Sequence, residues 1–155
     1  MFPEMRRKAQ VTSDEQAREL LEKGSAGVLS LMGPEGYPYG VPLSYLYREG
    51  KLYFHSAVQG AKVEALKQGD KASFCVIAAD QVDPEKFTTH YASVIAFGRV
   101  RTLEDPEQIQ LAMEGLGKKY SPGYEKEARE AIRQSAGHFL VLKMEIEHLT
   151  GKKAK

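Results

Sequence analysis

The chain has 155 residues, 42% hydrophobic and 28% charged, a composition that is ordinary for one globular domain. Its formal net charge of +1 gives no reason to expect nucleic-acid binding, which normally needs a dense basic face. No apolar run approaches the ~20 residues of a membrane span. The N-terminus lacks the apolar core of a signal peptide. Cys75 is the only cysteine, so we expect no internal disulfide and no cysteine-based metal site. By default we expect a single cytoplasmic domain over residues 1–155.

The first helix is predicted from its capping residues. Thr12 and Ser13 precede two acidic residues and a glutamine, the capping-box pattern that opens a helix, and Gly24 is a typical helix end. Apolar residues over 26–32 then predict a short strand, and the Gly-Pro-Glu-Gly sequence at 33–36 closes it as a turn.

The segment from residue 39 to residue 62 is the most informative part of the chain. Aromatic and apolar side chains alternate over residues 39–47, which predicts one half-buried strand. Residues 48–51 supply a hairpin turn in which Gly50 can take a positive φ. Residues 52–56 return as the next strand, which ends in a histidine and a serine shortly before a polar helix begins.

The middle of the chain is predicted to form one helix and two strands. The helix covers residues 61–67, and the continuous apolar run over residues 71–79 is typical of a strand buried on both faces. Residues 80–88 are polar and contain a proline, so they are predicted to form a loop. Residues 90–103 then form a long strand with a bend at Gly98.

Two helices and a strand complete the chain. Asp105 and Pro106 start a helix well, because proline suits the first helical position, and this helix is predicted to run to Tyr120. A second helix covers residues 124–135, and residues 138–148 form the last strand.

The fold class that these elements predict is mainly β with peripheral helices. Six strands follow one another mostly as a meander, and closure of such a sheet into a barrel hides its edges. The remaining residues 152–155 are expected to form a flexible tail.

A hydroxyl, a glycine and a lysine gather where the second helix is expected to begin. Ser56, Gly60 and Lys62 there could bind the phosphate end of a flat cofactor, because the N-terminus of a helix attracts anions. The structural alternative is that Lys62 is a solvated helix lysine and that His55 is a strand-end histidine satisfied by the backbone. The remaining histidines match no metal spacing, so no metal site is expected.

The sequence contains neither of two common nucleotide-binding motifs in its usual context. Residues 115–119, Gly-Leu-Gly-Lys-Lys, superficially resemble a phosphate loop, but they follow a helix rather than a strand, so the glycines are expected to end that helix. No Gly-x-Gly-x-x-Gly motif follows a strand, which argues against a dedicated dinucleotide domain. A nicotinamide donor would therefore dock only transiently.

The order VPLSYLY, LYFHSA and Gly60-x-Lys62 resembles the FMN-binding split β-barrels related to pyridoxamine 5′-phosphate oxidase, and within them the branch of the 5-nitroimidazole resistance proteins. The resemblance extends from about Met5 to about Ile146. It implies a six-stranded split β-barrel that binds FMN at the interface of a homodimer. Members of this branch often carry histidine or arginine just before the lysine, where this chain has Ala61, so one possible phosphate donor is missing.

The resemblance also implies the residues of the site. Lys62 and Ser56 would neutralise the FMN phosphate, and His55 is the candidate catalytic residue. Backbone groups of the strand after residue 39 would follow the polar edge of the isoalloxazine ring, and the later long strand would also reach the flavin, with Ser93 as a hydrogen-bond donor. The complete expected cofactor-binding set is Val41, Leu43, Ser44, Tyr45, His55, Ser56, Lys62, Tyr91, Ser93 and Val94.

The function that the resemblance implies is that of a small FMN-dependent oxidoreductase. Nitro-aromatic compounds such as 5-nitroimidazoles are the most specific substrate hypothesis, with a nicotinamide as the electron donor. The alternatives are a flavin- or haem-binding protein without turnover and a barrel that has lost its cofactor. A homodimer is also indicated by a group of tyrosines, which are enriched at interfaces: Tyr37, Tyr39, Tyr45 and Tyr47.

Overall fold

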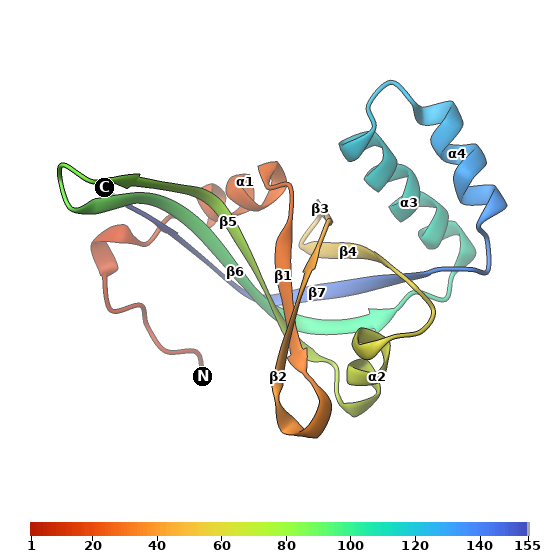
Figure 1. Ribbon diagram of the computed structural model, residues 1–155, viewed down its shortest axis with the longest axis horizontal. Helices are drawn as coiled ribbons and strands as arrows, with labels where there is room; N and C mark the ends of the chain where they lie inside the picture. The colour runs from red at the N-terminus through yellow and green to blue at the C-terminus, as the bar shows by residue number, and fades with distance from the viewer. Residues whose placement is uncertain (155) are drawn as a thin grey trace.

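The structure, a computed structural model, describes residues 1–154, which form four α-helices and seven strands (Figure 1). In chain order these elements are α1 (Asp14–Lys23), β1 (Gly27–Met32), β2 (Pro38–Leu43), β3 (Leu46–Arg48), β4 (Lys51–Ser56), α2 (Ala61–Gln68), β5 (Lys71–Asp83), β6 (Thr88–Thr102), α3 (Pro106–Tyr120), α4 (Glu125–Gln134) and β7 (Leu140–Lys153). None of the described helices is both long enough and apolar enough to cross a bilayer.

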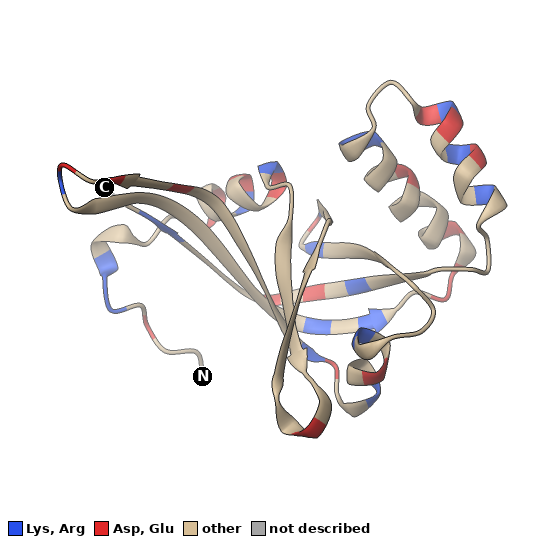
Figure 2. Cartoon of the chain, viewed as in Figure 1, with Lys and Arg blue, Asp and Glu red and all other residues tan. Residues whose placement is uncertain are grey.

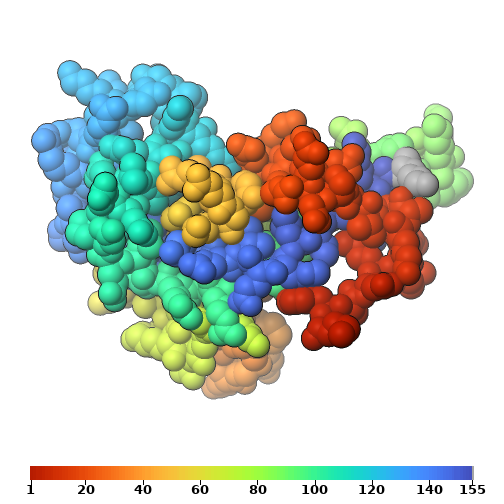
Figure 3. All heavy atoms as spheres, turned by 180° about the vertical axis from the view of Figure 1, so that it is seen from behind, coloured from red at the N-terminus to blue at the C-terminus, as the bar shows by residue number. Residues whose placement is uncertain are grey.

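The strands form one antiparallel sheet in the order β2-β1-β5-β6-β7-β4-β3. The long hairpin of β5 and β6 extends to one side of the molecule, whereas α3 and α4 stand together at the opposite end (Figure 1). Seen from behind, α1 and the N-terminal segment lie beside the last part of β7 (Figure 3). There the N–H of Thr12 donates to the carbonyl of Gly151 at 3.0 Å.

Two hydrophobic cores hold the elements together. In the main core, Leu21 of α1 and Ala65 of α2 join buried residues from the sheet. Its aromatic centre is Phe74, whose ring centroid lies 4.9 Å from that of Tyr45 and 5.0 Å from that of Phe54. A smaller core attaches α3 to the start of β7, and its members are Leu103, Ala112 and Val141, with Tyr53, Ile109, Met113 and Phe139 packed against them.

Several predicted boundaries are confirmed by local hydrogen bonds and dihedral angles. The hydroxyl of Ser13 accepts from the N–H of Gln16, and the Gln16 side chain accepts from the N–H of Ser13, each at 3.1 Å, which completes the capping box. The carboxylate of Asp105 caps α3. Glu49 and Gly50 both have positive φ, as a two-residue hairpin turn requires.

The predicted strand over residues 39–47 is in fact two strands, which makes seven strands instead of six. The division falls at Tyr45, whose N–H donates to the hydroxyl of Tyr120 at 2.9 Å and whose carbonyl accepts from Lys119 Nζ at 2.8 Å. Because side chains of α3 occupy both backbone groups, Tyr45 cannot join a strand ladder.

The sheet is open between its two outer strands. β2 and β3 lie at opposite ends of the strand order and do not pair with each other among the described residues, so the expected closure into a barrel is not confirmed. The main core is therefore not enclosed by the sheet alone, since α1 and α2 also contribute side chains to it.

The hairpin of β5 and β6 differs from the prediction in length and in burial. Its strands pair as far as Asp83 and Thr88, so the predicted loop over residues 80–88 is only a short turn. Phe74 and Val76 are buried as expected, but Ile77 is 68% exposed. The prediction of burial on both faces is therefore wrong for the single chain.

The last strand is longer than predicted. Lys152 pairs with Ser93 of β6, and β7 continues to Lys153, so the expected flexible tail is wrong for these two lysines; Lys155 lies outside the described residues. The predicted bend at Gly98 is confirmed by a register shift between β6 and β7. A Cβ at Gly98 would lie 1.9 Å from the carbonyl oxygen of Glu145, so only glycine fits there.

Candidate functional site

The segment that joins β4 to α2 carries the first group of expected site residues. The ladder between β4 and β7 places His55 opposite Val141 and Ser56 opposite Leu140. Ser56 is 3% exposed, and its hydroxyl donates to the carbonyl of the next residue at 2.9 Å. His55 is exposed, as alternation along the strand requires. The sheet therefore positions both side chains just before the start of α2.

The helix α2 begins without a side-chain cap. Its N-cap residue, Gly60, has a φ of 134°, and no side chain accepts a hydrogen bond from the first turn. Only glycine adopts this φ without strain. The N–H groups of a first turn need acceptors, and the helix dipole favours an anionic one. The start of α2 is thus suited to a phosphate group.

Lys62 lies in the first turn of α2 with a partly buried side chain. Burial lowers the pKa of Lys62 below its ordinary value, and no carboxylate among the described residues lies within ion-pair distance of it. Lys67 of the same helix, by contrast, pairs with Glu64 at 2.9 Å. Desolvation by neighbouring atoms, and to a smaller degree the charge of Lys62, also lower the pKa of His55. A bound anion would supply the negative charge that Lys62 lacks.

The expected residues on and after β2 divide between surface and core. Val41 and Leu43 are partly buried and pack against the main core, whereas Ser44 is exposed. Tyr45 is fully buried, and its phenol donates to the carbonyl of Leu21. Its backbone N–H and carbonyl are also occupied by side chains of α3. Tyr45, which was expected to contact the cofactor, therefore has a structural role within its own chain.

The second expected group lies on β6, in a different part of the molecule. Val94 is fully buried in the main core. The hydroxyl of Tyr91 donates to the Gln10 side chain, and Lys152 Nζ lies 5.4 Å from the centre of the Tyr91 ring. Ser93 is opposite Lys152 in the sheet.

The two groups are not brought together within one chain. Along β7, the partner of Ser93 is Lys152 and the partner of His55 is Val141, eleven residues earlier. At about 3.3 Å per residue, this separation corresponds to roughly 35 Å along an extended strand.

One neighbour of the candidate site was not predicted. The ring of Phe139, which directly precedes β7, lies 5.2 Å from the ring of His55, centroid to centroid. Phe139 is far from His55 in the sequence, and only the pairing of β4 with β7 brings them together. No local sequence pattern indicates this contact.

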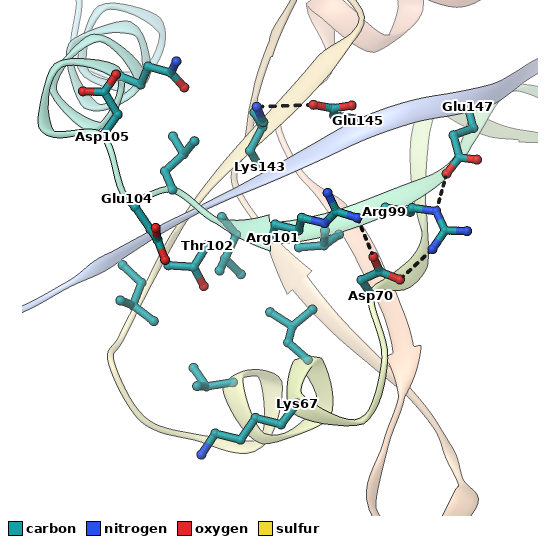
Figure 4. Close-up of a pocket in the computed structure, with 17 residues that line it drawn as sticks. Lys67, Asp70, Arg99, Arg101, Thr102, Glu104, Asp105, Lys143, Glu145 and Glu147 are labelled. Atoms are coloured by element: carbon teal, nitrogen blue, oxygen red, sulfur yellow. Dashed lines mark hydrogen bonds and ion pairs between the residues drawn. The ribbon is translucent and has the colours of Figure 1, made fainter.

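A cleft of about 930 Å³ lies elsewhere, between α2 and the ends of β6 and β7, and contains none of the expected site residues (Figure 4). Its basic side chains already have carboxylate partners. Arg99 Nη1 lies 3.0 Å from a carboxylate oxygen of Asp70, Arg101 Nη2 lies 3.2 Å from the other oxygen, and Lys143 pairs with Glu145 at 3.3 Å. This internal pairing makes the cleft a poor site for a phosphate.

No cluster of three or more metal-ligating side chains occurs in the part of the chain that the structure describes. The donors at the candidate site are instead hydroxyl, imidazole, ammonium and backbone N–H groups. These groups suit an anionic organic cofactor rather than a metal ion.

The family model described as pyridoxamine 5′-phosphate oxidase matches residues 13–153, and the chain therefore belongs to that family. No curated relative matches the chain in sequence.

Solved structures of similar fold include proteins named for flavin binding and for drug resistance. A protein provisionally named a 5-nitroimidazole antibiotic resistance protein, from Bacteroides thetaiotaomicron, is 22% identical with a TM-score of 0.76. The match covers 92% of this chain and 85% of the neighbour's chain. A FAD and heme binding protein from Mycobacterium smegmatis is 23% identical with a TM-score of 0.80, covering 94% and 73%. A FAD-binding protein from Mesorhizobium loti is 24% identical with a TM-score of 0.67, covering 94% and 98%. At these identities the likeness is one of fold.

Proposed function

We propose that the protein binds FMN at the start of α2 and works as an FMN-dependent oxidoreductase. The observation that carries this proposal is Lys62, a partly buried lysine at an uncapped helix N-terminus beside His55, with no carboxylate partner among residues 1–154. Membership of the pyridoxamine 5′-phosphate oxidase family and the FAD-binding proteins among the structural neighbours support a flavin as the cofactor.

The expected site residues around the start of α2 have separate roles in this proposal. The ammonium group of Lys62 and the first N–H groups of α2 hold the phosphate, and Ser56 lies beside them. Backbone groups near Val41, Leu43 and Ser44 face the edge of the flavin ring. FMN, when bound, supplies the redox chemistry, and the protein supplies orientation and electrostatics.

His55 is the candidate catalytic residue. Desolvation and the charge of Lys62 lower the pKa of His55, which favours the neutral imidazole, a form in which one ring nitrogen accepts a hydrogen bond and the other donates one. Such a group can position a substrate or transfer a proton at the flavin face. His55→Ala should lower turnover more than FMN content, and an equal loss of both would remove His55 from catalysis.

We propose a homodimer, in which a second copy brings Ser93 and Tyr91 to the flavin that Lys62 holds. The separation of the two residue groups along β7 supports this arrangement. The outer face of the sheet offers an apolar surface for this contact, because Val28, Cys75 and Ile95 lie side by side on three neighbouring strands and Ile77 is exposed next to them. Tyr45 was expected at the interface, but it is buried within its own chain. We therefore propose this apolar surface as the dimer contact.

Nitro-aromatic compounds are the proposed substrates, with a nicotinamide as the electron donor. The named 5-nitroimidazole resistance protein among the structural neighbours supports this choice. If the proposal holds, a nicotinamide should reduce the flavin of the loaded protein, and a nitro-aromatic should reoxidise it faster than oxygen alone.

The absorption spectrum of freshly purified protein tests the cofactor. Flavin bands near ~375 and ~450 nm are expected for bound FMN. A haem Soret band in their place would favour the alternative of a haem-binding protein without turnover, which the FAD and heme binding neighbour supports. Colourless protein that also fails to take up added FMN would contradict the proposal.

A further inference from the structure

We propose that the cleft between α3 and α4 is a binding site for a small amphipathic carboxylate, a molecule with an apolar body and one anionic end. The cleft has a volume of about 700 Å³, within the ~300–1,000 Å³ that is usual for small-molecule sites. It lies where the two helices stand out from the sheet (Figure 1) and is separate from the cleft of Figure 4.

The floor of the cleft is apolar. Ile109 and Phe139 belong to the edge of the smaller core and are only partly buried, and Ile132 of α4 is 8% exposed beside them. Ala136 lines the same cleft without covering these side chains. The packing of α3 against α4 therefore leaves apolar surface that the apolar body of a ligand can cover.

The rim of the cleft is predominantly basic. Lys126, Arg129 and Arg133 line it from α4, against the single carboxylate of Glu130, and the mixture of charges along α4 is visible in Figure 2. Glu130 pairs with Arg133, so its charge is already balanced. Arg129 has only a long contact to Glu114, 3.7 Å from Nε.

Lys126 is the cation best placed to receive an anionic ligand. No carboxylate within the described part of the chain lies within ion-pair distance of its Nζ. Lys126 also lies in the first turn of α4, where the helix dipole disfavours a cation. Lys126 is exposed, so its ammonium group is free to approach a carboxylate at the rim, which would also offset the unfavourable dipole contact.

The cleft adjoins the candidate flavin site. Phe139 forms part of its floor, and the same ring lies 5.2 Å from the ring of His55. Binding of a carboxylate does not depend on a flavin. A role for the cleft as a substrate subsite does rest on the proposed function.

Isothermal titration calorimetry with two matched probes tests the site on the full chain, with and without FMN. The probes are 2-naphthoate, which has an apolar body and a carboxylate, and 2-naphthalenemethanol, which has the same body without a charge. We expect 2-naphthoate to bind more tightly. Lys126→Gln should weaken 2-naphthoate about fivefold and leave the alcohol unchanged, whereas Lys86→Gln, on the β5–β6 turn, should change neither.

A second pair of variants tests the apolar floor without removing core side chains. Ala136→Phe should fill the cleft and abolish binding of both probes, whereas Ala131→Phe, an exposed position of α4 outside the cleft, should leave both unchanged. Circular dichroism confirms that each variant is folded. Equal affinity for the two probes, or binding that survives Ala136→Phe in folded protein, would overturn the proposal. Failure to bind FMN with intact 2-naphthoate binding would contradict only the flavin function.

Discussion

Lys62→Ala is the most informative single substitution, because it removes the proposed phosphate ligand and leaves the flavin ring contacts in place. A hydrogen bond to a charged group contributes ~1.5–3 kcal/mol, which corresponds to roughly 10- to 150-fold in affinity at ~1.4 kcal/mol per decade. The upper part of this range is expected. Lys62 is partly buried without a carboxylate partner, so water screens its charge less, and Ala61 offers no second basic group.

Fluorescence titration with FMN and with riboflavin measures this effect. Riboflavin has the same ring without the phosphate, so Lys62→Ala should leave its affinity nearly unchanged. Lys67→Ala is the matched control, because Lys67 lies in the same helix but is exposed and paired with Glu64. Ala61→Arg should strengthen FMN binding alone if the added guanidinium reaches the phosphate. An equal loss for the two flavins, or no loss for FMN, would refute the phosphate site.

Three further substitutions test the pH response, the assembly and the strand break. The pKa of His55 is lowered from 6.5 in the folded protein, so His55 binds a proton more readily in the unfolded chain. The melting temperature should therefore fall as pH drops below about 6.5, and it should fall less steeply in His55→Gln. Parallel curves for the two proteins would contradict this. Ile77→Glu should convert a dimer to monomers in light scattering, whereas Leu111→Glu on α3 should not. Tyr45→Phe leaves the buried carbonyl of Leu21 without its donor and should cost ~1–3 kcal/mol of unfolding free energy, compared with little change for Tyr47→Phe.

The parts of the fold that were predictable depend on neighbouring residues in the sequence. The capping box at Ser13, the turn at Gly50 and the start of α3 are local patterns, and the structure confirms all three. The break at Tyr45 was not predictable, because it depends on hydrogen bonds to Lys119 and Tyr120, more than seventy residues away. Alternation alone therefore suggested one continuous strand.

The exposure and length of the later strands also depend on distant contacts. The apolar run around Ile77 indicates burial, but the single chain leaves that side chain exposed, a pattern that burial in a second copy would explain. Lys152 and Lys153 have low strand propensity, yet pairing with β6 holds them in β7.

The candidate site was predictable in the part that is contiguous in sequence. His55, Ser56 and Lys62 lie within eight residues, so their gathering at a helix start follows from the order of the elements. The separation of Ser93 from this group and the contact of Phe139 with His55 both depend on the register of β7, which no local pattern specifies.

Native mass spectrometry of the protein loaded with FMN tests the central claim most directly, because it reports cofactor and assembly together. The account predicts two chains carrying two FMN molecules, with Lys62→Ala losing FMN and Ile77→Glu losing both dimer and FMN. A monomer that retains FMN, or a dimer that takes up none, would contradict the claim that this chain binds flavin at a site shared between two copies.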